Sequence, residues 1–149
     1  RFVIQRVSEA SVKIDNSIYS EIQKGFLVLV GVEEADTKED ADWLCNKLIS
    51  MRIFSDDDEK MNLSLQDISG DLLLVSQFTL FASTKKGNRP SFIKSAKPDI
   101  AIPLYEYCIK QLSQLLSKPI KTGQFGADMK VSLVNDGPVT ILMDSKNKE

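Results

Sequence analysis

The chain has 149 residues, of which 42% are hydrophobic and 27% are charged, a size and balance typical of one folded globular domain. This composition excludes a disordered or fibrous protein. The chain contains no histidine, which excludes Ser-His-Asp and Cys-His catalytic sites and histidine-bound zinc. We therefore expect one domain covering residues 1–149, without a bound metal.

The formal net charge is −2, so a nucleic-acid partner would have to be bound by a local basic patch. The apolar runs are far shorter than the roughly 20 residues that cross a bilayer. The first residues alternate as in a strand and do not form an apolar leader, which favours the cytoplasm. We expect a cytoplasmic protein with no membrane span.

Alternation of apolar and polar side chains predicts the first strands. They are expected over Phe2–Val7, Ala10–Ile14 and Ile18–Ile22, with a turn at residues 15–17, as in an antiparallel meander. The run Phe26–Val32 is apolar on both faces, as in a central strand covered by helices. No glycine-rich phosphate-binding motif follows any of these strands, so we expect no nucleotide cofactor.

A helix is predicted from about Thr37 to Ser50, because apolar residues recur there at helical spacing. Asp36 and Glu39 resemble a capping box at its start. A short strand near Met51–Phe54 should follow. The acidic run within Ser55–Lys60 lacks the spacing of a calcium loop, which favours a solvated surface loop.

The second half predicts a strand over Asp71–Phe81, interrupted by a polar pair, and a helix that starts at Pro98 and ends near Ser117. Its apolar stripe contains Cys108, and the first helix contains Cys45. Both thiols are expected in the core. Short strands are predicted over residues 129–133 and 139–143.

Two segments stand out as candidate sites, although each has a simpler structural explanation. Ser76-Gln-Phe-Thr-Leu80 lies at the carboxyl end of a buried strand, where mixed sheets tend to place their sites, but a strand end satisfying its own backbone is an alternative. Asn135-Asp-Gly-Pro-Val-Thr140 resembles a hairpin turn. Pro138 weakens that interpretation, because proline cannot donate to a strand ladder and its preceding bond can be cis.

The order and spacing of these two segments resemble those of the D-aminoacyl-tRNA deacylase family. The likeness extends to Gln5-Arg6-Val7, to Lys86-Gly-Asn-Arg-Pro-Ser-Phe92 and to Phe125-Gly-Ala-Asp-Met129. It implies hydrolysis of the ester bond of D-aminoacyl-tRNA, and of mischarged glycyl-tRNA, as translation quality control. It also implies a homodimer that needs no metal or other cofactor.

The resemblance also implies roles for individual residues. Ser76, Gln77, Phe78 and Thr79 would line the pocket that holds the terminal adenosine and the ester. Gly137 and Pro138, joined by a cis bond, would enter the pocket of the other subunit and reject L-aminoacyl groups. Arg6 would hold this dipeptide in place, with a surface salt bridge as the alternative.

The expected chemistry is modest, because an aminoacyl ester beside a ribose hydroxyl is already labile. Backbone N–H groups around Gln77 to Thr79 would stabilise the oxyanion, at roughly 3 kcal/mol per donor. A water molecule and the substrate 2′-hydroxyl would take part in the attack. Thr79 is a candidate nucleophile, but no residue supplies a base to activate it, so we favour a positioning role.

A basic patch is predicted to bind the tRNA phosphates, with Lys85, Lys86 and Arg89 at its centre. Lys94 and Lys97 extend it, and no acid interrupts the run from residue 85 to residue 97. A solvated lysine-rich loop is the alternative.

We expect one mixed α/β domain of curved β-sheets with two main helices packed on one side, dimerising through its final hairpin region. A non-catalytic RNA- or protein-binding module is the main rival, with both motifs acting only as turns. An esterase acting on small D-amino acid esters is a second rival, which would need no basic patch.

Overall fold

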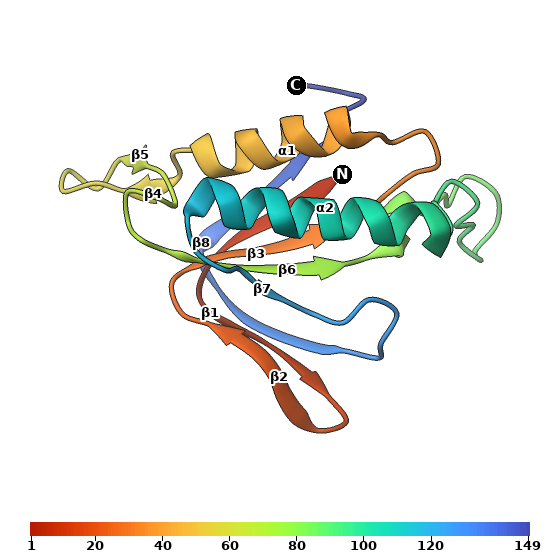
Figure 1. The fold of residues 1–149 in the computed structure, drawn as a ribbon, viewed down its shortest axis with the longest axis horizontal. Coiled ribbons are helices and arrows are strands. Elements are labelled where there is room, and N and C mark those ends of the chain that lie inside the picture. The colour runs from red at the N-terminus through yellow and green to blue at the C-terminus, as the bar shows by residue number, and fades with distance from the viewer.

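A strongly curved six-stranded sheet is the centre of the fold, in a computed structural model that describes all residues from 1 to 149. Two helices, α1 (Lys38–Ser50) and α2 (Pro98–Leu116), lie side by side on one face of the sheet (Figure 1). This arrangement confirms the predicted α/β class. The strands of the sheet are β1 (Phe2–Ile14), β2 (Ser17–Ile22), β3 (Gly25–Val30), β6 (Asp71–Ser76), β7 (Lys121–Thr122) and β8 (Lys130–Met143).

The strand order is β2-β1-β3-β6-β7, and β8 pairs with the other edge of β1. The β3–β6 and β6–β7 pairs are parallel, and the other pairs are antiparallel. Along one edge, β1 pairs with β3 through Phe2–Val7 and with β2 through Ala10–Ile14. In Figure 1 the end of β1 that pairs with β2 curves away from the helices.

The strand β1 is continuous, so the prediction of two strands was wrong. Ser8 and Glu9 are exposed and break the alternation of the side chains, but the backbone continues to pair with β8 through register shifts on either side of Val7. The last two predicted strands also form one strand, β8, and no hairpin exists there. In both strands a local irregularity interrupts the alternation of side chains, and the sequence pattern was therefore interpreted as the end of a strand.

The predicted strand over Asp71–Phe81 ends at Ser76 and is followed by a 3₁₀ turn, η1 (Phe78–Phe81). Its neighbour β3 ends at Val30, two residues earlier than predicted. The N–H of Gln77 donates the last interstrand bond to the Val30 carbonyl, at 2.7 Å. After Gln77 the chain no longer pairs with β3, and it forms the 3₁₀ turn η1.

The first helix starts as predicted, but with a different cap. Thr37 is the N-cap, and its N–H donates to the Asp40 carboxylate at 2.9 Å. Asp36, which was predicted to cap the helix with Glu39, instead accepts a bond from the Glu33 N–H at 2.9 Å. The short strand predicted near residue 51 is displaced as well. It forms β4 (Phe54–Ser55), which pairs with β5 (Met61–Leu63) in a small separate hairpin.

Both faces of the central strands are buried. Phe26 and Val28 of β3 face the helices, in a cluster that also contains both cysteines, as predicted. Leu27 of β3 and Leu73 of β6 lie on the opposite face, against residues of β1 and β2. The second face is therefore covered by the curl of the sheet itself and not by helices.

The remaining predictions concern metals and membranes. The acidic loop within residues 55–60 is largely exposed, as predicted. No cluster of cysteine and carboxylate side chains has the arrangement of a metal site. Neither helix combines the length and apolar character that crossing a membrane requires.

The placement of the core gives a stability prediction. Leu74 of β6 is fully buried between the sheet and the helices, so Leu74→Ala should lower the free energy of unfolding by about 2–5 kcal/mol. Urea denaturation measures this change. Ile18 is half exposed, and Ile18→Ala should change the same quantity by less than about 0.5 kcal/mol. Equal losses in the two variants would contradict this assignment of the core.

Candidate active site

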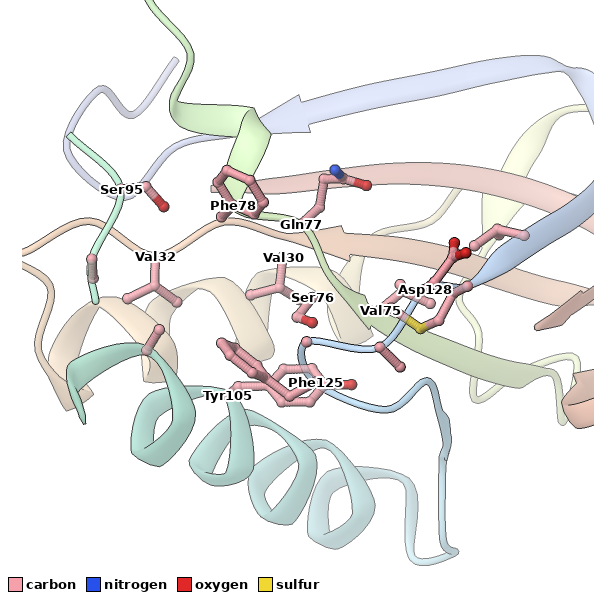
Figure 2. A pocket seen from close by; sticks show the side chains of 16 residues that line it. Val30, Val32, Val75, Ser76, Gln77, Phe78, Ser95, Tyr105, Phe125 and Asp128 are labelled. Atoms are coloured by element: carbon pink, nitrogen blue, oxygen red, sulfur yellow. The ribbon is translucent and has the colours of Figure 1, made fainter. Parts of the chain in front are cut away.

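A cavity of about 330 Å³ opens where the parallel strands β3 and β6 end. Figure 2 shows it between these strand ends, helix α2 and the segment that leads into β8. Most of its lining is hydrophobic. The lining residues are Val30, Val32, Val75, Ser76, Gln77, Phe78, Ser95, Ala96, Ala101, Tyr105, Phe125, Gly126, Ala127, Asp128, Met129 and Val131.

The pocket lining contains only two titratable side chains that an acid–base mechanism could use, Tyr105 and Asp128. The Tyr105 hydroxyl donates to the Leu74 carbonyl at 2.8 Å, and burial raises the pKa of this hydroxyl well above its ordinary value. Its ring lies 6.0 Å from the ring of Phe125, between centroids. Asp128 is the one carboxylate in the lining; its side chain is 87% exposed and pairs with Lys130 at 3.0 Å. A flat apolar ligand fits this lining better than a charged one.

The structure brings three of the four predicted catalytic residues to this pocket. Ser76, Gln77 and Phe78 are in the lining, at the point where β6 ends. Thr79 is not, but its hydroxyl accepts a hydrogen bond from the side-chain amide of Gln77. Thr79 therefore contacts the pocket through Gln77.

The backbone donors near the pocket are fewer than predicted. The N–H of Gln77 is occupied by the Val30 carbonyl, and the 3₁₀ turn uses the N–H groups of Leu80 and Ala82. The N–H groups of Phe78 and Thr79 precede the first donor of the turn and take no part in its hydrogen bonds. These two groups are the candidates for binding an oxyanion.

The Gly-Pro segment forms a bulge in β8. Gln5 of β1 pairs with Thr140 and Val7 pairs with Asn135, so residues 136–139 stand opposite Arg6 alone. The bond between Gly137 and Pro138 is cis. A hairpin turn was one interpretation of this segment. The segment is instead a four-residue bulge, residues 136–139, which we call the β8 bulge.

Arg6 is buried beneath the β8 bulge, with 9% of its surface exposed. Its Nε donates to the Asp136 carbonyl at 2.8 Å, and its Nη1 donates to the Ile53 carbonyl at 2.6 Å. The Asp136 carboxylate is farther away, with its Oδ2 3.8 Å from the Arg6 Nε. The salt bridge considered as the alternative for Arg6 is present only as this long contact, made by a buried guanidinium.

Gly137 is suited to the bulge because a side chain would not fit there. A Cβ at this position would lie 2.4 Å from the Val139 backbone nitrogen and 2.8 Å from a Val139 methyl group. The residues Asp136, Gly137 and Pro138 are all exposed. None of them lines the pocket of the same chain.

The predicted tRNA-binding residues Lys85, Lys86 and Arg89 are exposed on the loop between η1 and α2, and none of them takes part in an ion pair. The loop is attached to the pocket at two points. The rings of Phe78 and Phe92 meet edge to face, 5.2 Å apart, and Ser95 and Ala96, at the end of the loop, line the pocket. The basic loop therefore adjoins the cavity.

Sequence reasoning missed the aromatic side of the pocket. Tyr105 belongs to the apolar stripe of α2 and was assigned to the core, where most of its surface does lie. Phe125 and Met129 carried part of the family likeness but received no role. The pairing of β6 with β7 helps to bring Phe125 beside Tyr105 of α2 (Figure 2). No local sequence pattern predicts that pairing.

The fold is a mixed α/β fold shared with a protein described as a tRNA deacylase. A solved structure described as a probable eukaryotic D-amino acid tRNA deacylase has the same fold, with a TM-score of 0.82, 17% identity and coverage of 94% of this chain and 96% of that chain. The sequence model of the D-Tyr-tRNA(Tyr) deacylase family matches residues 3–144. The chain belongs to this family, as its motifs indicated, and is an enzyme.

Similar proteins match along almost the whole chain. The D-aminoacyl-tRNA deacylase of Flavobacterium johnsoniae is 64% identical over 149 residues, which cover 100% of this chain and 99% of the relative. That of Bacteroides fragilis is 62% identical, with the same coverage. A solved structure of c-Myc DNA Unwinding Element Binding Protein is 37% identical, with a TM-score of 0.89 and coverage of 96% of this chain and 97% of that chain.

Proposed function

We propose that this protein hydrolyses the ester bond of D-aminoacyl-tRNA and releases the free D-amino acid and the tRNA. The observation that carries the proposal is family membership over nearly the whole chain. The pocket supports it, because its aromatic and aliphatic lining suits the base of the terminal adenosine. The ester would then lie at the pocket edge, beside Ser76 and Gln77.

The proposed reaction uses backbone groups and the substrate itself. Water adds to the ester carbonyl carbon, the bond to the ribose 3′ oxygen breaks, and that oxygen takes up the proton. The N–H groups of Phe78 and Thr79 stabilise the oxyanion, at roughly 3 kcal/mol per donor. The 2′-hydroxyl of the substrate orients the water. Thr79 acts in positioning, because its hydroxyl is bonded to Gln77 and no base lies beside it.

The chiral selection is assigned to the β8 bulge of a second subunit, in a homodimer. Gly137 and Pro138 are exposed on one chain and absent from its own pocket, as expected if they act on the pocket of a partner. A rigid backbone there would collide with the side chain of an L-aminoacyl group and leave room for a D side chain. Arg6 holds the bulge through the Asp136 carbonyl.

The same filter would accept glycine, which has no side chain to reject. Mischarged glycyl-tRNA is therefore a second proposed substrate. Removal of D-aminoacyl and wrongly attached glycyl groups would serve as quality control of translation. We place this activity in the cytoplasm, where charged tRNA is used.

One assay separates this proposal from its rivals. The purified protein should release the amino acid from D-aminoacyl-tRNA at least about a hundredfold faster than from the matching L-aminoacyl-tRNA. EDTA should leave the rate unchanged, since the chain offers no metal-binding cluster. A protein that binds tRNA without turnover would be the non-catalytic module. Equal activity on free D-amino acid esters would indicate the small-molecule esterase.

The basic loop supplies a prediction about tRNA binding. Removing the charges of Lys85, Lys86 and Arg89 together should weaken tRNA binding equally for all attached amino acids and lower the slope of its salt dependence by about 2–3. Titrations at several salt concentrations measure both effects. A matched control removes the exposed charges of Lys13, Lys47 and Lys60, none of which lines the pocket. Unchanged affinity in the first variant would show that RNA binds elsewhere.

The filter proposal predicts which subunit supplies selectivity. Gly137→Ala forces the β8 bulge to shift and should lower the D over L rate ratio by about tenfold or more. Ala127→Trp fills the pocket. A mixed dimer of one Gly137→Ala chain and one Ala127→Trp chain has one intact pocket, and it should keep the wild-type ratio because its filter comes from the other chain. A ratio as low as that of the Gly137→Ala dimer would place the filter and the pocket in the same chain.

A further inference from the structure

The β8 bulge has a second support that the mechanism above does not use. We propose that Asn135 is a positioning residue that fixes the shape of the bulge and thereby sets the preference for D over L substrates. This inference rests on the proposed filter role of Gly137 and Pro138.

The side-chain amide of Asn135 closes the base of the bulge by three hydrogen bonds. Its Oδ1 accepts from the Val139 N–H at 2.8 Å. Its Nδ2 donates to the Val139 carbonyl and to the Thr140 hydroxyl, both at 3.3 Å. The amide therefore satisfies both backbone polar groups of Val139, as an adjacent strand would have done.

Such a substitute is needed because residues 136–139 have lost their partners in β1. The two central residues cannot restrain themselves, since Gly137 has no side chain and Pro138 has no N–H to donate. Arg6 bonds only the first residue of the bulge, through the Asp136 carbonyl. Asn135 bonds the last one. The two side chains together hold the Gly-Pro pair at both ends.

The return to the sheet is also fixed by polar side chains. Gln5 of β1 donates to the Thr140 hydroxyl at 3.3 Å, and Thr140 is paired with Gln5 in the ladder. Asn135 contacts the same hydroxyl. A residue at position 135 must therefore both accept and donate, which an amide does and which a carboxylate or an apolar side chain does not.

The test compares Asn135→Ala and Asn135→Asp with Asn46→Ala, whose amide donates only to the Asp42 carbonyl on the exposed surface of α1. The rates with D- and L-aminoacyl-tRNA bearing the same amino acid are measured for each variant. Asn135→Ala should lower the D over L ratio about tenfold, with tRNA affinity unchanged. Asn135→Asp keeps the acceptor of the 2.8 Å bond and should lower the ratio about threefold. Asn46→Ala should match the wild type.

An unchanged ratio in Asn135→Ala, or an equal loss of both rates, would overturn the inference. Gly137→Ala in the same assay separates the two proposals. If Gly137→Ala lowers the ratio and Asn135→Ala does not, only the role of Asn135 is wrong. If neither lowers it, the filter itself is wrong. Should Asn135→Ala fail to fold, Asn135→Asp decides, and an unchanged ratio overturns the inference.

Discussion

The geometry of the molecule depends on the pairing of β1 along both of its edges. One edge is shared between β3 and β2, and the other is bonded to β8 over most of its length. Because β3 and β2 pair with different parts of the same edge, β1 has to twist and bend between them. The irregular pairing around Val7 lies at this bend. The sheet curls there, and its second face closes over the side chains of Leu27 and Leu73. One layer of helices is then enough to bury both faces.

The parallel pair next to β1 places the pocket. Because β3 and β6 are parallel, they end at the same edge of the sheet, and the last bond between them joins Gln77 to Val30. The chain turns sharply after this bond, which leaves polar backbone groups beside an apolar cavity. The irregularity that curls the sheet also includes the β8 bulge, on the opposite edge of β1 from β3. Curvature and bulge thus share one origin in the irregular pairing of β1 with β8, and the pocket comes from the parallel ends of β3 and β6.

The sequence was informative where one pattern had one structural meaning. The helices were predicted nearly to the residue, because their apolar spacing and their ends are local. The breaks in alternation at Ser8-Glu9 and at Gly137-Pro138 were misinterpreted, since a bulge and a strand end look alike without the partner strand. The polar pair Ser76-Gln77 was singled out from the sequence and lines the pocket, but the aromatic wall opposite, with Tyr105 and Phe125, depends on long-range pairing. The burial of Arg6 could not be predicted either, because its hydrogen-bond partners Asp136 and Ile53 lie far from it in the sequence.

The groups that hold the β8 bulge also determine how this part of the protein depends on pH. The acceptors of the buried Arg6 guanidinium are the carbonyls of Asp136 and Ile53, which do not titrate. The amide of Asn135 does not titrate either. The chain contains no histidine. The hydrogen bonds that hold the bulge therefore involve no group that changes its charge near neutral pH. The hydrogen bonds that shape the bulge are therefore independent of the proton concentration around neutral pH.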